Sequence, residues 1–198
     1  MSPPSGPGGD VSKVQSRRYK VSYPVLELEG LTANFEKYLQ GLGFTPDQKD
    51  LIVPQVETVT PEIASLFLGV LPVGESVVHR SRLQGIKNMI PLRIGNIYYP
   101  QEIAAPYMDQ LLNDTAFDMP AALKVAGIVI TREKINIRSY TRSTREERAA
   151  LSVIRTHPLL EVRRICYDDA GGVVTMHRTI WDGSKVSYTF DRPIDFWK

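Results

Sequence analysis

The chain has 198 residues, of which 42% are hydrophobic, and this is enough apolar material for the core of one domain. A formal net charge of +2 by itself indicates neither a nucleic-acid nor a membrane partner. The single cysteine, Cys166, cannot form an intramolecular disulfide and favours a reducing cytoplasm. No apolar run approaches the roughly 20 residues of a membrane span, so we expect a cytoplasmic protein with no membrane partner.

The first 20 residues differ in composition from the rest of the chain. Residues 1–10 are rich in Pro, Gly and Ser, and the next ten residues contain a basic cluster that ends at Lys20. Such a segment buries little apolar surface, which predicts a flexible basic arm over residues 1–20 and a folded domain over residues 21–198. Contact of this arm with nucleic acid is the alternative.

Apolar spacing and capping residues predict several short helices. The first ends at Gly43, where a helix C-terminus favours glycine. The second begins with Thr60 as N-cap and Pro61 at the first helical position, where the missing N–H costs nothing. The helices are expected at residues 35–42, 61–67 and 120–125, and after a capping box formed by Ser143 with Glu146.

Extended segments are predicted where β-branched or alternating residues stand between turn sequences. Residues 75–83 and 92–99 suggest a hairpin, and residues 128–137 suggest a further extended segment. Three closely spaced runs predict an antiparallel meander, at residues 159–167, 172–181 and 185–190. Strands with interspersed helices, without strict βαβ alternation, favour an α+β fold with an antiparallel sheet flanked by helices.

The sequence lacks the common catalytic and cofactor signatures, including the Walker loop, G-x-G-x-x-G, G-x-S-x-G and H-E-x-x-H. We therefore expect neither a cofactor nor a metal. Arg80 and Arg82 are more informative, because residues two apart on a strand point the same way. Two guanidinium groups on one face suit a carboxylate or a phosphate. An exposed basic strip paired with acidic neighbours is the alternative.

The predicted strand at residues 172–181 has one face that combines polar and aromatic groups. The same alternation places Thr175, His177, Thr179 and Trp181 side by side. These hydroxyl, imidazole and indole groups could line a pocket that has aromatic walls and a few polar fixing points. They could equally form the solvent face of a sheet.

Several segments occur in the order of a known set of motifs. Residues 61–69 followed by 74–82 contain a short helix, a G-E-x-V turn and a strand carrying R-x-R. The later segments of the set are residues 90–92 with 98–100, Arg138 with 143–147, 158–164 and 169–174. Over roughly residues 24–190 this ordered set resembles the UTRA domain, the effector-sensing domain of HutC-type regulators in the GntR superfamily.

The resemblance implies a fold like that of chorismate lyase, with a ligand pocket between the antiparallel sheet and its helices. It implies anion contacts from the R-x-R arginines, and it places the segment around Thr32 and Phe35 at the border of the pocket. Thr175 stands where the family usually has an acidic residue, which indicates an unusual effector class. The candidate ligand-binding residues are Thr32, Phe35, Arg80, Arg82, Tyr98, Arg138, Thr175, His177 and Trp181.

The leading functional hypothesis is a binding module that senses a small organic anion and forms a homodimer. The family's winged helix-turn-helix, of about 70 residues, has no counterpart before Tyr23, so we expect no sequence-specific DNA binding by this chain. The alternative is an enzyme of chorismate-lyase fold, a cofactor-free lyase or isomerase acting on an anionic substrate. His177 would then be the acid or base, because His79 points away from the arginines. A structural partner that dimerises through an exposed sheet edge is a third possibility.

Overall fold

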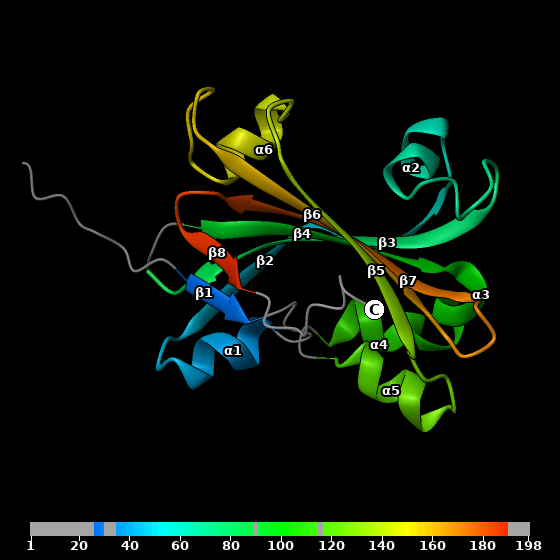
Figure 1. Ribbon diagram of the computed structural model, residues 1–198. Helices are drawn as coiled ribbons and strands as arrows, with labels where there is room; N and C mark the ends of the chain where they lie inside the picture. Colours follow the sequence, from blue (N-terminus) through cyan, green and yellow to red (C-terminus); the bar gives the residue numbers. More distant parts are fainter. Residues whose placement is uncertain (1–25, 30–34, 89–90, 115–116, 190–198) are drawn as a thin grey trace, which may run out of the picture.

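A six-stranded sheet with helices on both faces forms the body of the protein (Figure 1). The computed structural model describes residues 26–29, 35–88, 91–114 and 117–189. All neighbouring strands in this sheet are antiparallel, which confirms the predicted α+β class. In spatial order the strands are β2 (Pro46–Thr58), β3 (Ser76–Ile86), β4 (Pro91–Pro100), β7 (Val173–Asp182), β6 (Leu159–Tyr167) and β5 (Arg132–Ser139).

The last strand leaves this sheet. β8 (Val186–Thr189) pairs in parallel with β1 (Leu26–Glu29) in a separate two-stranded sheet. The predicted three-stranded meander is therefore wrong at its final step, because only β6 and β7 pair. The turn after β7 is fixed by its own hydrogen bonds, since Asp182 Oδ1 accepts from the Ser184 N–H at 3.1 Å and Gly183 N–H donates to Pro158 O at 3.0 Å.

The helices divide between the two faces of the sheet. In Figure 1, α1 (Phe35–Gly41), α4 (Met108–Asn113) and α5 (Met119–Val125) lie on one side, and α2 (Pro61–Leu66) and α6 (Arg145–Ala150) lie on the other. Two short turns, α3 (Gln101–Ala104) and η1 (Ala105–Tyr107), lead from β4 to α4. None of the helices in the described ranges is long and apolar enough to cross a membrane.

The helix starts follow the predicted caps with one shift. Thr60 caps α2, and its hydroxyl accepts a hydrogen bond from Ile63 N–H. The capping box of α6 lies one residue later than predicted, at Thr144 with Glu147. Tertiary contacts explain the shift, because the Glu147 carboxylate also accepts from Tyr140 Oη at 3.0 Å and from Arg178 Nη1 at 2.8 Å.

The edge strand β2 was not predicted from the sequence. Its 13 residues include Pro46 and Pro54, and most of its side chains are exposed or half-buried. Its pairing with β3 is irregular between Asp50 and Gln55. An edge strand tolerates prolines and irregular pairing because one side of its backbone has no neighbouring strand, but both features weaken the alternating sequence pattern.

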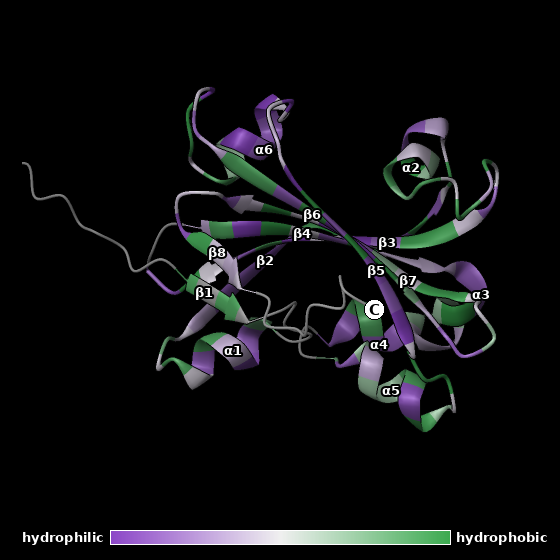
Figure 2. Ribbon diagram, viewed as in Figure 1, coloured by the Kyte–Doolittle hydropathy of each residue, from purple (hydrophilic) through white to green (hydrophobic). Residues whose placement is uncertain are grey.

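Separate apolar clusters attach the helices to the cavity side of the sheet. In Figure 2, hydrophobic and hydrophilic residues alternate along the strands, so each strand contributes to both faces. Phe35 and Leu39 of α1 pack with Trp181, whereas Leu111 of α4 and Leu123 of α5 pack in another cluster. With α1 and α4–α5 anchored at different places, the middle of this face is left for polar side chains.

Candidate functional site

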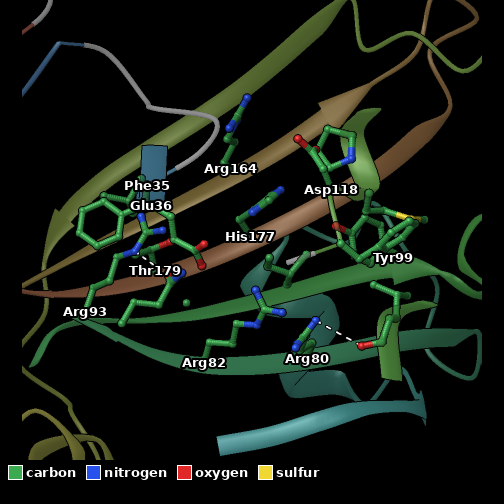
Figure 3. Close-up of a pocket in the computed structure, with 18 of the residues that line it drawn as sticks. Phe35, Glu36, Arg80, Arg82, Arg93, Tyr99, Asp118, Arg164, His177 and Thr179 are labelled. Carbon is green, nitrogen blue, oxygen red and sulfur yellow. Dashed lines mark hydrogen bonds between the residues drawn. The ribbon is translucent and has the colours of Figure 1, made fainter. Parts of the chain in front are cut away.

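A cavity of about 190 Å³ lies between the sheet and α1, α4 and α5 (Figure 3). Its floor consists of side chains from four neighbouring strands. Its roof comes from α1, α4, β8, the start of α5 and the segment that leads into α5. The floor residues are Arg80, Arg82, Gln84, Arg93, Gly95, Ile97, Tyr99, Val162, Arg164, His177 and Thr179, and the roof residues are Phe35, Glu36, Leu111, Phe117, Asp118, Met119, Pro120 and Tyr188.

Strand register arranges the floor in rows that run across the sheet. The first row reads Arg80, Ile97, His177 and Arg164, and the second reads Arg82, Gly95, Thr179 and Val162. Gln84 and Arg93 begin the third row. Because residues opposite each other on antiparallel strands share a face, four arginines from three strands reach one floor. His177 stands beside Arg164 in the first row.

Arg80 and Arg82 share a carboxylate from β2. Asp50 Oδ1 accepts from Arg80 Nε at 2.9 Å and from Arg82 Nε at 3.2 Å, and Asp50 Oδ2 accepts from Arg80 Nη2 at 3.0 Å. Burial favours a higher pKa for Asp50, but the hydrogen bonds and charges of the two arginines outweigh it and hold the pKa below its usual value. The pair is therefore a partly neutralised cationic site.

Arg93 is held by aromatic and amide groups. Its guanidinium carbon lies 3.9 Å from the Phe35 ring centroid and 5.0 Å from that of Trp181, and its Nε donates to Gln84 Oε1 at 2.8 Å. No carboxylate of the described residues lies within 4.0 Å of its nitrogen atoms. Burial lowers its pKa to about 10, so Arg93 remains charged at neutral pH.

His177 is a neutral group on this cationic floor. Removal from water, together with the charges of Arg164 and Arg93, lowers its pKa to about 3. Its Nε2 lies 3.3 Å from Thr175 Oγ1, which donates a hydrogen bond to Tyr98 O at 3.2 Å. The imidazole therefore offers hydrogen bonding without charge.

The roof carries the acidic groups of the cavity. Glu36 lies in the first turn of α1, and Asp118 caps α5 by accepting from Ala121 N–H at 3.2 Å. Asp118 also lies 3.9 Å from Lys37 Nζ. Figure 3 shows Glu36 near Arg93. The cavity thus combines cations on the floor with carboxylates on the roof.

The structure brings four of the predicted site residues together in this cavity, namely Phe35, Arg80, Arg82 and His177. Two others share that face of β7 and support these residues from the neighbouring rows. Thr175 is buried and hydrogen-bonded to His177, and Trp181 is buried with its ring centroid 5.2 Å from that of Phe35. Thr32 lies outside the described residues.

Tyr98 and Arg138 do not line the cavity. Strand alternation puts Tyr99 on the cavity floor and Tyr98 on the opposite face, where its ring stacks on His79 with centroids 4.1 Å apart. Arg138 Nε donates to the buried Glu161 on that opposite face. Both residues belong to packing and charge networks away from the cavity.

Sequence reasoning missed Arg93, Arg164 and Glu36. The alternation of Arg93, Gly95, Ile97 and Tyr99 along one strand was a usable signal, but only the register with β3 shows that this set shares the face of Arg82. Gly95 stands opposite Arg82, and a Cβ there would lie 3.3 Å from Gln84 Oε1, so the Gln84 side chain packs closely over this glycine.

Solved structures with the same fold are transcriptional regulators. PhnF from Mycobacterium smegmatis superposes with a TM-score of 0.73 at 15% identity, covering 88% of this chain and 74% of PhnF. The separate effector domain of PhnF gives a TM-score of 0.66 at 16% identity, covering 85% of this chain and all of that domain. The C-terminal domain of the histidine utilization repressor from Pseudomonas syringae pv. tomato gives 0.57 at 20% identity, covering 77% and 99%.

Sequence comparison supplies the family. No curated protein matches the chain significantly. The UTRA domain family, in contrast, matches residues 44–187, which include the six-stranded sheet and every strand of the cavity floor. Since this match spans well over half of the 198 residues, the chain belongs to the UTRA domain family.

Proposed function

We propose that this chain is the effector-binding domain of GntR/HutC-type transcription regulation and that its effector is a small organic anion. The observation that carries the proposal is that the guanidinium groups of Arg80, Arg82 and Arg93 lie together on the floor of one cavity. Membership of the UTRA family supports a regulatory ligand-binding role. The nature of the ligand follows from the charges.

Carboxylates and phosphates are the natural partners of such a floor. A guanidinium group donates two parallel hydrogen bonds to these oxygen anions, and a site shielded from water strengthens them. Arg93 supports an anionic ligand most strongly. It is charged, and no carboxylate of the described residues lies within 4.0 Å of its guanidinium nitrogen atoms. Stacking on Phe35 fixes the plane of its guanidinium group, which reduces the entropy lost when a ligand binds.

We further propose that the 198-residue chain acts in the cytoplasm as a homodimer and does not by itself recognise an operator. Effector binding in regulators of this kind shifts an equilibrium between two arrangements of a dimer. The helices of the described residues have at most seven residues each, which supports the second part of this proposal. Mass measurement in solution tests the dimer, and a gel shift showing sequence-specific binding by this chain would contradict the second part.

Thermal unfolding with a panel of carboxylates and phosphates tests the ligand class. A ligand present at about 100 times its dissociation constant adds about 2.7 kcal/mol to the free energy of unfolding. We expect Arg82→Gln and Arg93→Gln to lose this stabilisation, whereas Arg145→Gln on exposed α6 removes an equal charge and keeps it. An anion that stabilises all four proteins equally would contradict the proposal. Recovery of the bound anion unchanged separates sensing from catalysis.

A further inference from the structure

His177 occupies a defined place in the cavity. It lies on β7, opposite Ile97 of β4 on one side and Arg164 of β6 on the other. The charged groups that share the cavity with it are the floor arginines Arg80, Arg82, Arg93 and Arg164 and the roof carboxylates Glu36 and Asp118. With arginines on three floor strands around it, a proton on the imidazole is strongly disfavoured.

The hydrogen bonds of Thr175, next to the ring, favour one tautomer of His177. The Thr175 hydroxyl has one proton, and it donates this proton to the Tyr98 carbonyl oxygen at 3.2 Å. The same hydroxyl oxygen lies 3.3 Å from His177 Nε2 and is left with lone pairs to offer, an arrangement that favours the tautomer with the N–H at Nε2. A neutral imidazole has only one N–H, so in this tautomer Nδ1 is an acceptor.

Nothing in the described part of the chain donates to Nδ1, because the contact with Thr175 is the only hydrogen bond of the His177 ring there. A hydrogen-bond acceptor that is shielded from water favours ligands that donate a hydrogen bond to it. The four arginines around the cavity supply donors for a ligand, whereas His177 Nδ1 supplies an acceptor among them.

We propose that His177 determines specificity: its Nδ1 accepts a hydrogen bond from a hydroxyl or N–H group of the effector, whose anionic group is bound by the floor arginines. This inference rests on the proposed function and narrows the ligand class. The effector is a hydroxylated or amino-substituted acid or phosphate, and a plain alkyl acid or phosphate is a poor ligand. A site that offers an acceptor discriminates against an analogue lacking the donor, because the acceptor is then left unpaired.

The tautomer can be tested without any ligand. Nitrogen-15 spectra of the full chain labelled at histidine report the state of each ring nitrogen, and His177→Gln assigns the signals of His177. We expect a protonated Nε2 and an unprotonated Nδ1 that stay unchanged from pH 8 to pH 5. A ring protonated at Nδ1, or one that titrates near pH 6, overturns the inference whatever the ligand is.

Matched probes test the specificity by calorimetry. Glycerol 3-phosphate differs from propyl phosphate, and 3-hydroxybutyrate from butyrate, chiefly in hydroxyl groups. We expect the hydroxylated member of each pair to bind the natural chain at least about tenfold more tightly, the effect of about one hydrogen bond. In His177→Phe this ratio falls to about one. Thr175→Val, which removes the group that orients the ring, reduces the ratio severalfold.

Sulfate is the control for folding, because it offers anionic oxygens without a hydroxyl donor. Its affinity should stay within about twofold in both variants, whereas Arg93→Gln weakens it about tenfold. Equal binding of both members of a pair overturns the role of His177 and leaves the proposed function standing. Failure of sulfate and of all four probes to bind contradicts the proposed function, and this inference with it.

Discussion

Asp50 accepts two hydrogen bonds from Arg80, at 2.9 Å from Nε to Oδ1 and at 3.0 Å from Nη2 to Oδ2. The carboxylate comes from the edge strand β2, and the arginine lies on the floor of the cavity. This bidentate pair has the geometry with which the arginine would bind a carboxylate or phosphate ligand. Asp50 therefore competes with an anion for Arg80 and, through the 3.2 Å contact, for Arg82.

Asp50→Asn should raise the affinity of the cavity for sulfate severalfold, because it removes this competing charge while keeping the size of the side chain. The same change should lower the free energy of unfolding by about 1–2 kcal/mol, since a charged hydrogen-bond acceptor is lost. Calorimetry and denaturant unfolding measure the two effects. Asp47→Asn, at an exposed position of the same strand, should change neither. Unaltered sulfate affinity in Asp50→Asn would rule out the competition.

Arg93→Lys tests whether anion binding needs the planar guanidinium group or only its positive charge. Lysine keeps the positive charge but loses the planar group that stacks 3.9 Å from the Phe35 centroid and can donate two parallel hydrogen bonds. We expect sulfate to bind about tenfold more weakly, which corresponds to about 1.4 kcal/mol. The matched control is Arg145→Lys on α6, which should have no effect. Normal binding by Arg93→Lys would show that charge alone suffices.

The depressed pKa of His177 predicts a specific pH dependence of stability. The pKa is about 3 in the folded protein and about 6.5 when the chain is unfolded, so between these values the unfolded state binds the additional proton. The contribution of His177 to stability is complete above pH 6.5 and declines as the pH falls below it. From pH 7 to pH 5 the natural chain should lose on the order of 1 kcal/mol relative to His177→Gln, because solvent partly screens this half-buried side chain. Parallel stability curves for the two proteins would refute the shift.

Gly183→Ala should destabilise the turn that directs the chain out of the main sheet. A Cβ at this position would lie 3.0 Å from the carbonyl oxygen of Pro158, a backbone atom that is held by the N–H of Gly183 itself. We expect a loss of about 1–3 kcal/mol in denaturant unfolding. Gly172→Ala is the comparison, because the atoms nearest to its Cβ belong to the Asp168 side chain, which can move aside at the cost of one exposed hydrogen bond from the Gly172 N–H. Equal effects of the two changes would contradict this explanation.

Local patterns were sufficient for several parts of the fold. Thr60 and Pro61 predicted the start of α2, because capping depends on a few adjacent residues. The spacing of Arg80 and Arg82 placed both on one face, and the spacing of His79 and Arg80 placed the histidine on the other, because strand alternation is a property of the backbone. The family motifs led to the antiparallel sheet with helices at its faces.

Tertiary structure decided what the sequence pattern left open. Hydrogen bonds between distant segments pair β8 with β1 and place β2 at the edge of the main sheet. They also decide that Tyr99, and not Tyr98, lines the cavity. The register of the strand pairs places Arg93 and Arg164 on the same face of the sheet as the two arginines of β3. No local sequence pattern contains that information. The sequence by itself therefore determined the family and the pair of arginines, whereas long-range pairing decided which side chains share the cavity.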